Sequence, residues 1–233
     1  MGVESNLEVV RGRIDAACAA AQRDPSQVRL IAVSKGRPTD DIRAAYAAGQ
    51  RDFGENRVQE LADKASELAD LDDLHWSMIG HLQTNKVADV ARCAAEVQSV
   101  DSLRLAQLLD HRLSDLGRSL PVLIQVNTSG EDSKSGVSPD DVVGFARELT
   151  TYPLLVPMGL MTIALQSDDP EQVSACFRSL VEVRRQVEAA TDRRWPELSM
   201  GMSGDLELAI TAGATCVRVG TAIFGPRPAE PLS

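Results

Sequence analysis

The sequence predicts an α/β fold, a (β/α)8 TIM barrel that occupies residues 1–233 as a single domain. Eight short apolar or β-branched runs alternate with longer helical patterns, and eight is the number of strand and helix repeats in such a barrel. The length of 233 residues suits one barrel. No Pro-, Gly- or Ser-rich linker interrupts the chain, so no domain boundary is predicted. An open doubly wound sheet is the alternative, because alternation alone does not require closure.

The elements can be placed in order along the chain. The predicted strands occupy residues 29–33, 51–53, 75–79, 97–100, 122–126, 158–162, 197–200 and 215–219. Asp101 precedes a predicted helix over 102–116, and Ser138 with Pro139 precedes one over 140–149, where proline suits the first turn. An extra N-terminal helix over about 7–22 comes before the first strand, and we expect it outside or beneath the barrel.

Composition excludes several classes of function. A formal net charge of −10 argues against sequence-independent nucleic-acid binding, which needs basic faces. No apolar stretch reaches the roughly 20 residues that span a bilayer, and the first residues do not resemble an export signal. The cysteines are far apart and form no CxxC pair, so we expect reduced thiols and no metal site; they are Cys18, Cys93, Cys176 and Cys216. We therefore expect a cytoplasmic protein that binds neither nucleic acid nor membrane.

Barrel proteins carry their chemistry at the carboxyl ends of the strands, which directs attention to Lys35. This lysine follows the first predicted strand at once, in the sequence Ala-Val-Ser-Lys. It has two interpretations: a surface charge that reaches out from the rim, or a desolvated amine with a lowered pKa that forms a Schiff base with an aldehyde.

The loops after the seventh and eighth strands are rich in small residues. Ser203 and Gly204 follow the seventh strand, and Gly220 and Thr221 follow the eighth. Either loop alone is equally well explained as a tight turn. Together they occupy the usual phosphate-binding position of such barrels, because glycines allow close approach and a helix N-terminus favours an anion. Asp205 can serve simply to stabilise the first helical turn.

Arg218 lies within the last predicted strand. If Val217 and Val219 face the surrounding helices, the guanidinium of Arg218 points into the barrel. A buried guanidinium needs a partner, and two are considered: a strand-end carboxylate in a structural pair, or the nitrogen of a bound heterocycle. In the second case the heterocycle nitrogen stays unprotonated and the ring becomes a weaker electron sink.

Several motifs in the same order resemble the pyridoxal phosphate (PLP) homeostasis proteins, a PLP-binding family related to the barrel domain of alanine racemase. The similarity covers nearly the whole chain. It rests on AVSK at 32–35, FGENRVQE at 53–60, IGHLQTNK at 79–86, VLIQVN at 122–127, EDSKSG at 131–136, GLMT at 159–162, LSMGMSGD at 198–205 and VRVGTAIFG at 217–225. Two departures concern charge at the pocket mouth: Gly36-Arg37 replaces a more usual Thr-Lys, and Arg57 stands where an aromatic residue is common.

The resemblance implies a barrel like the alanine racemase N-terminal domain, with PLP held as a Schiff base on Lys35. It implies that Arg218 faces the pyridine nitrogen. The other implied cofactor-binding residues are Asn56 near the ring, Met200, and Ser203, Gly204, Gly220 and Thr221 at the phosphate. The implied function is intracellular PLP (vitamin B6) homeostasis as a carrier or buffer, without turnover and with no catalytic residue.

A PLP-dependent amino-acid racemase is the main alternative. Two-base racemisation needs a second proton-transfer group, which related racemases take from a tyrosine in an additional C-terminal β domain. Tyr46 and Tyr152 are expected in or beside helices, and the chain ends at Ser233, which favours the carrier. His81 is the one histidine expected near the mouth. An aldolase or sugar-phosphate isomerase would need a strand-end carboxylate, for which Glu55 is the nearest candidate.

The remaining expectations concern partners. Lys134, after the fifth strand, is expected to be a solvated loop charge, with a second PLP-binding amine as the alternative. PLP-dependent apo-enzymes are the expected recipients of PLP, and a monomer is expected.

Overall fold

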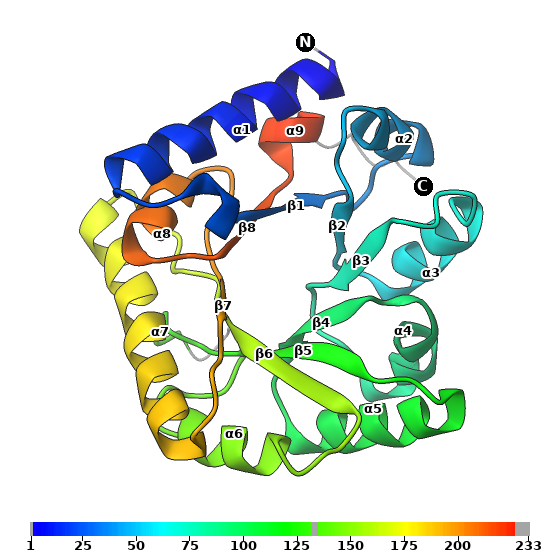
Figure 1. Ribbon diagram of the computed structural model, residues 1–233, viewed down its shortest axis with the longest axis vertical. Coiled ribbons are helices and arrows are strands. Elements are labelled where there is room, and N and C mark those ends of the chain that lie inside the picture. Colours follow the sequence, from blue (N-terminus) through cyan, green and yellow to red (C-terminus); the bar gives the residue numbers. More distant parts are fainter. Residues whose placement is uncertain (1, 132–134, 227–233) are drawn as a thin grey trace.

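Eight parallel strands close into a barrel in the computed structural model, which describes residues 2–131 and 135–226 (Figure 1). The strands are β1 (Arg29–Val33), β2 (Asp52–Glu55), β3 (His75–Met78), β4 (Glu96–Val100), β5 (Leu120–Gln125), β6 (Leu155–Met161), β7 (Glu197–Ser199) and β8 (Cys216–Val219). Closure comes from the pairing of β1 with β8, in which Arg29 lies opposite Cys216 and Ala32 opposite Val219. The (β/α)8 prediction is confirmed, and the open sheet is excluded.

Helices surround the barrel as a second layer (Figure 1), and apolar side chains fill the space between the two layers. These helices are α2 (Thr39–Ala47), α3 (Val58–Glu67), α4 (Val87–Cys93), α5 (Leu103–Leu116), α6 (Val142–Leu149), α7 (Pro170–Thr191), α8 (Leu206–Ala212) and α9 (Thr221–Phe224). Short 3-10 turns occupy Pro25–Gln27 and Thr84–Lys86. Within the described ranges, no helix combines the length and the apolar character that crossing a bilayer requires.

Two predicted helix starts need correction. The side chain of Ser102, rather than Asp101, caps α5 by accepting a hydrogen bond from the backbone N–H of Leu105 at 3.3 Å. The helix predicted from residue 140 begins at Val142, so Pro139 lies in the preceding turn instead of the first helical turn. Both errors arise because several residues with similar capping chemistry stand in a row, and only the backbone angles select one.

The extra N-terminal helix, α1 (Val3–Ala20), lies outside the barrel, where Figure 1 shows it running beside α8 and α9. Asn6 donates a hydrogen bond to the carbonyl of Ile223 at 2.8 Å, and Arg13 donates one to the carbonyl of Ser203 at 3.0 Å. Arg13 also pairs with Glu207 on α8. The helix therefore supports both loops that were predicted to hold a phosphate.

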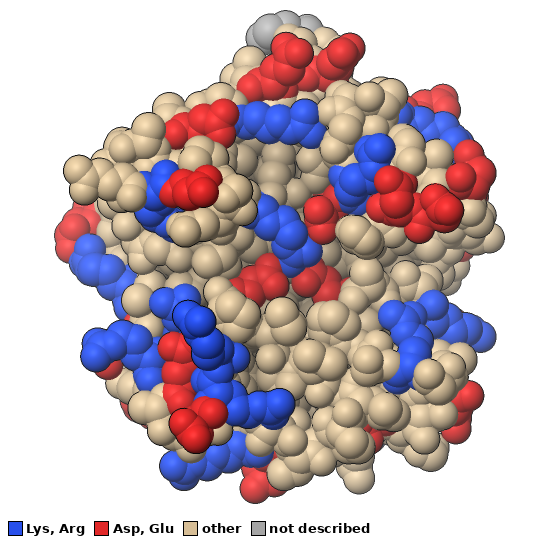
Figure 2. Space-filling model, in the orientation of Figure 1, with Lys and Arg blue, Asp and Glu red and all other residues tan. Residues whose placement is uncertain are grey.

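Charged side chains gather inside the barrel at the amino ends of its strands. The guanidinium of Arg29 forms ion pairs with Asp52, Glu96 and Glu197, which come from three other strands. Figure 2 shows basic and acidic side chains meeting over the centre of the barrel. Successive side chains of a strand point to opposite faces, so the residues after Arg29 that also point inward are Ile31 and Val33. Lys35 continues that inward series.

Candidate functional site

A cavity of about 240 Å³ lies at the carboxyl ends of the strands. It brings together residues that are far apart in the sequence, since Lys35 and Thr221, which are 186 positions apart, both line it. Its lining consists of Val33, Lys35, Asn56, Ile79, Ile163, Met202, Ser203, Gly204, Arg218, Gly220 and Thr221. An amine, a guanidinium and two small-residue loops thus meet in one cavity, in the arrangement that the strand-end rule predicts.

The backbone on both sides of Lys35 is held from the helix layer. Lys64 on α3 donates to the carbonyl of Ser34 at 2.8 Å, and the hydroxyl of Ser34 donates to Glu55 at 2.7 Å. On the other side, the backbone N–H of Gly36 donates to Glu60 at 2.7 Å. Lys64 completes the cluster through ion pairs with both glutamates. We call Ser34, Glu55, Glu60 and Lys64 the lysine-loop clamp, because it fixes the exit of β1.

Glu55 points away from the cavity and is fully buried against α3. Its Oε1 accepts from Lys64 at 2.7 Å, whereas its Oε2 has no hydrogen-bond partner among the described residues. Burial raises the pKa of the Glu55 carboxyl, although the Lys64 ammonium opposes this rise. A carboxylate in this place cannot reach a substrate in the cavity. The strand-end carboxylate that an aldolase would need is therefore not supplied by Glu55.

The loops after β7 and β8 are joined to each other at the cavity wall. The hydroxyl of Ser203 accepts a hydrogen bond from the backbone N–H of Ala222 at 3.4 Å. Asp205 accepts from the backbone N–H of Met202 at 2.5 Å and so closes its own loop, instead of bonding to the first turn of α8. Gly201 has a φ of +94°, and a Cβ there would lie 2.5 Å from the Cβ of Ala209, so only glycine fits.

Arg218 points into the barrel, as its place in the last strand predicts, and is 4% exposed. Its guanidinium donates to the hydroxyl of Ser199 at 2.6 Å and to the carbonyl of Thr162 at 2.8 Å. Both of these partners are neutral. Of the two options that the sequence left open, a structural pair with a strand-end carboxylate is therefore not what the described residues form. Burial lowers the pKa of Arg218, and nearby acidic groups that include Glu197 oppose the shift.

Asn56 reaches the cavity from the end of β2, where it packs tightly against Gly80. A Cβ at Gly80 would lie 2.2 Å from the carbonyl oxygen and 2.7 Å from the Cα of Asn56. Backbone atoms cannot yield at such distances, so glycine is required in the Ile-Gly-His sequence. This close approach fixes where Asn56 enters the cavity.

Comparison with known proteins identifies the family. The sequence model described as the N-terminal domain of alanine racemase matches residues 6–228. The chain is 44% identical over 225 residues to the pyridoxal phosphate homeostasis protein of Pseudomonas aeruginosa, with 97% of this chain and 96% of that protein covered. The protein of the same name from Escherichia coli strain K12 is 42% identical over 234 residues, with 97% of each covered. The chain belongs to the pyridoxal phosphate homeostasis protein family.

Solved structures place the same fold in this family and beyond it. PipY of Synechococcus elongatus with PLP bound has a TM-score of 0.85 and 39% identity, with 96% of this chain and 100% of that chain covered. PipY without PLP has a TM-score of 0.87. An alanine racemase from Clostridium difficile has a TM-score of 0.76 at 15% identity and covers 98% of this chain but 58% of its own. That last similarity concerns the fold alone.

Seven of the eight residues that the family resemblance nominated line the cavity, and Met200 does not. Met200 is fully buried and belongs to the apolar core between barrel and helices. Because side chains alternate along a strand, Ser199 faces the barrel interior and Met200 faces the helices. Met202 lines the cavity in its place, as do Val33, Ile79 and Ile163. Their positions at or just after strand ends could have indicated these four cavity residues in the sequence. Apolar residues are so common at strand ends, however, that these four could not be distinguished from the rest.

The racemase alternative depends on a second proton-transfer group near the cavity. Neither of the two tyrosines lines it: Tyr46 on α2 donates to Asp73 at 2.6 Å on the outer surface, and Tyr152 follows α6. His81 lines an adjoining cavity of about 290 Å³, which shares Asn56, Ile79 and Ile163 with the first. Its Nδ1 lies 3.1 Å from Asp101. Lys134 lies outside the described residues.

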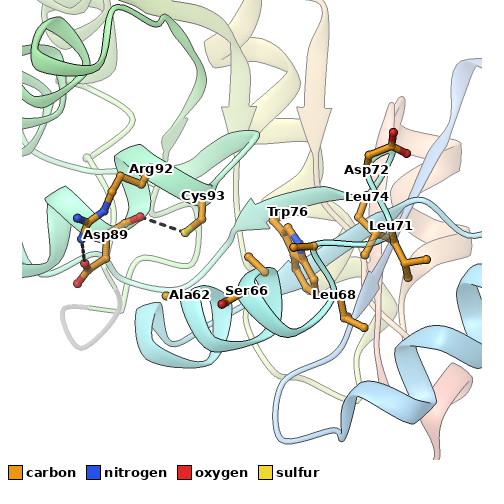
Figure 3. A pocket seen from close by; sticks show the side chains of 12 residues that line it. Ala62, Ser66, Leu68, Leu71, Asp72, Leu74, Trp76, Asp89, Arg92 and Cys93 are labelled. Carbon is orange, nitrogen blue, oxygen red and sulfur yellow. Dashed lines mark hydrogen bonds and ion pairs between the residues drawn. The ribbon is translucent and has the colours of Figure 1, made fainter.

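A larger cavity of about 470 Å³ lies between α3 and α4, away from the candidate site (Figure 3). Its apolar part includes Trp76 and Leu71, and its charged residues are Asp72 and the ion pair of Asp89 with Arg92. Burial raises the pKa of the Cys93 thiol to about 11, and this thiol donates to the carbonyl of Asp89 at 3.0 Å. The Cys93 thiol is protonated and the Arg92 guanidinium is held in its ion pair with Asp89, so neither is a reactive group in this cavity. We therefore take the strand-end cavity as the candidate site because of the reactive groups that line it, although its volume is smaller.

Proposed function

We propose that this chain binds PLP in the strand-end cavity as a Schiff base on Lys35 and takes part in PLP homeostasis as a carrier or buffer. The observation that carries the proposal is the meeting of Lys35, Arg218 and the two small-residue loops in one cavity. Membership of a family named for PLP homeostasis and the similarity to PLP-bound PipY support it. When bound, PLP supplies an aldehyde carbon that condenses with an amine.

The cavity fits the three functional parts of PLP at three separate places. An amine at the end of β1 suits the aldehyde, backbone N–H groups and hydroxyls of the loops after β7 and β8 suit the phosphate, and a guanidinium on β8 suits the ring nitrogen. Asn56 lies on the wall formed by β2, where it can contact the ring. We assign the cofactor-binding roles to Lys35, Asn56, Arg218 and the loop residues Ser203, Gly204, Gly220 and Thr221.

The amine of Lys35 must be presented in one direction to condense with an aldehyde. The lysine-loop clamp does this by holding Ser34 and Gly36, the two neighbours of Lys35, through side chains of β2 and α3. Pre-ordering these backbone atoms removes part of the entropy cost of reaction. The amine of Lys35 is therefore presented from a fixed backbone anchor.

Arg218 favours storage over turnover. A guanidinium stays protonated at neutral pH, so a ring nitrogen that faces it remains an unprotonated acceptor. The unprotonated pyridine withdraws electrons weakly, which disfavours carbanion chemistry at a bound amine. Because neither tyrosine lines the cavity, we propose that the protein performs no stereocontrolled turnover. His81 is the residue that a racemase would have to use.

The wider assignments follow from this role. We propose that PLP-dependent apo-enzymes are the recipients of PLP, that the protein acts in the cytoplasm and that it is a monomer. Analytical ultracentrifugation with and without PLP tests the last of these.

An absorbance titration tests the binding proposal. Wild-type protein with PLP should develop the yellow band of a protonated Schiff base, and Lys35→Ala should lack it. The chain contains four lysines, at positions 35, 64, 86 and 134. After borohydride reduction, peptide mass spectrometry should therefore find the pyridoxyl group at position 35, and Lys86→Ala serves as the matched control that keeps the band. An unchanged band in Lys35→Ala would reject the proposal.

The same preparation separates carrier from racemase. L-Alanine incubated with the PLP-loaded protein in deuterium oxide should keep its α-proton signal over hours. Rapid exchange that is lost in His81→Ala would establish racemase-like chemistry instead.

A further inference from the structure

A line of buried polar side chains runs inside the barrel from Arg218 toward the amino ends of the strands. Arg218 donates to the hydroxyl of Ser199 at 2.6 Å, and Ser199 donates to Oε1 of Gln98 at 2.7 Å. The amide of Gln98 then donates to Glu96 at 2.8 Å. All four residues are at most 6% exposed. We call Arg218, Ser199, Gln98 and Glu96 the axial chain.

Glu96, at the far end of the axial chain, belongs to the charged cluster at the amino ends of the strands. Oε1 of Glu96 also accepts from the hydroxyl of Ser77 at 2.6 Å and from the guanidinium of Arg29 at 2.9 Å. Arg29 in turn pairs with Asp52 and Glu197. Glu96 is therefore held from several strands and provides a rigid anchor for Gln98.

The direction of every bond in the axial chain is determined by chemistry. A guanidinium only donates, so the single proton of the Ser199 hydroxyl is left for Gln98. The carboxylate of Glu96 only accepts, so it receives the NH₂ group of Gln98 and turns the amide oxygen toward Ser199. Reversing any member would place two donors or two acceptors together. One orientation is thus selected for Ser199 and Gln98.

Such a chain serves a guanidinium that must act on a ligand. A direct carboxylate partner would neutralise Arg218 and draw its N–H groups away from the cavity. A hydroxyl and a backbone carbonyl instead fix its plane, no carboxylate among residues 2–131 and 135–226 forms an ion pair with it, and Arg218 still lines the cavity. The carboxylate of Glu96 stands at the far end of the axial chain, beyond Ser199 and Gln98. There it polarises these two side chains without contacting Arg218.

We propose that Ser199 and Gln98 are positioning residues that aim the Arg218 guanidinium at the ring nitrogen of bound PLP. This inference rests on the proposed function, because it requires PLP in the cavity. Ser199 holds one edge of the guanidinium, and Gln98 determines where the Ser199 hydroxyl points. Neither residue lines the cavity.

The test compares PLP with a deaza analogue in which carbon replaces the ring nitrogen. Wild-type protein should bind PLP more tightly than the analogue. Ser199→Ala and Gln98→Leu should each weaken PLP binding by about three- to tenfold, the effect of one net hydrogen bond, and leave binding of the analogue nearly unchanged. Both should also shift the absorbance maximum of the bound chromophore, which a purely structural role would not move.

Ser77→Ala is the matched control, because like Ser199→Ala it deletes one buried serine hydroxyl. The hydroxyl of Ser77 donates to Glu96 instead of Gln98. It leaves the bonds between Arg218, Ser199 and Gln98 in place and should keep the preference for PLP over the analogue. If Ser199→Ala does not fold, two other variants replace it. Ser199→Thr keeps the hydroxyl, and Ser199→Val has the shape of threonine without the hydroxyl. Threonine should keep the preference and valine should lose it.

The outcomes distinguish this inference from the proposed function. If wild-type protein forms the yellow band and Lys35→Ala does not, the function stands. An equal loss of affinity for PLP and for the analogue, or a preference that survives in both Ser199→Ala and Gln98→Leu, would then overturn the positioning role alone. Absence of the band in wild-type protein would overturn both.

Discussion

Replacing Lys64 by methionine tests the lysine-loop clamp most directly. Lys64 is 7% exposed, and its ammonium donates to Ser34, Glu55 and Glu60. Methionine keeps most of the aliphatic volume, so packing against the barrel changes little. The charge, however, disappears from beside a carboxylate that is fully buried.

The expected cost follows from the surroundings of Glu55. Its Oε2 already lacks a hydrogen-bond partner among the described residues, and burial raises its pKa even with Lys64 present. Removing one member of a buried ion pair costs about 3–5 kcal/mol, because the other charge is left uncompensated. We therefore expect Lys64→Met to lower the free energy of unfolding by an amount in this range. Slower Schiff-base formation at Lys35 should accompany the loss, because the carbonyl of Ser34 is released.

Urea unfolding measures the first effect, and stopped-flow absorbance with PLP measures the second. Arg43→Met is the control on an exposed pair, since Arg43 and Asp70 are 43% and 57% exposed, and it should change stability little. The double variant Lys64→Met/Glu55→Gln removes the stranded charge and should recover at least half of the loss. A Lys64→Met protein whose stability lies within about 1 kcal/mol of wild type would refute the reasoning, because the change would then not have left an uncompensated charge on buried Glu55.

Three further outcomes are expected. Arg13→Ala removes the hydrogen bond from α1 to the loop after β7, and a PLP titration should show affinity lower by about two- to threefold with the yellow band retained; unchanged affinity would mean that α1 does not support the loop. Gly80→Ala forces a methyl group to within 2.2 Å of the Asn56 carbonyl oxygen and should weaken PLP binding by about tenfold, whereas Gly144→Ala, with open space around it, should not. The folded pKa of Glu55 lies above its ordinary 4.5, so its contribution to stability is fully present below about pH 4.5 and is lost as pH rises through the folded pKa. Glu55→Gln should remove this decline, and urea midpoints from pH 4 to pH 8 measure it; parallel pH profiles of the two proteins would contradict the assignment.

The sequence by itself determined the repeat pattern and the places where chemistry could stand. Eight apolar runs separated by helical patterns predicted the barrel, because hydrophobic periodicity is a local property of the chain. The position of Lys35 directly after the first run, and the small residues after the seventh and eighth, could be read in the same way. Arg218 was predicted to point inward from the alternation of its neighbours, and this is confirmed.

Only the tertiary structure decided how those places relate to one another. Closure depends on β1 meeting β8, a contact between segments 187 residues apart that no local pattern encodes. Glu55 and Met200 both stand at or next to strand ends, yet they face the helices, because the pleat of each strand and its register against its neighbours decide which side chains turn inward. The lysine-loop clamp and the axial chain likewise join side chains from separate strands and helices. Directional hydrogen bonds of this kind arise only when the closed barrel brings donors and acceptors to within 3 Å.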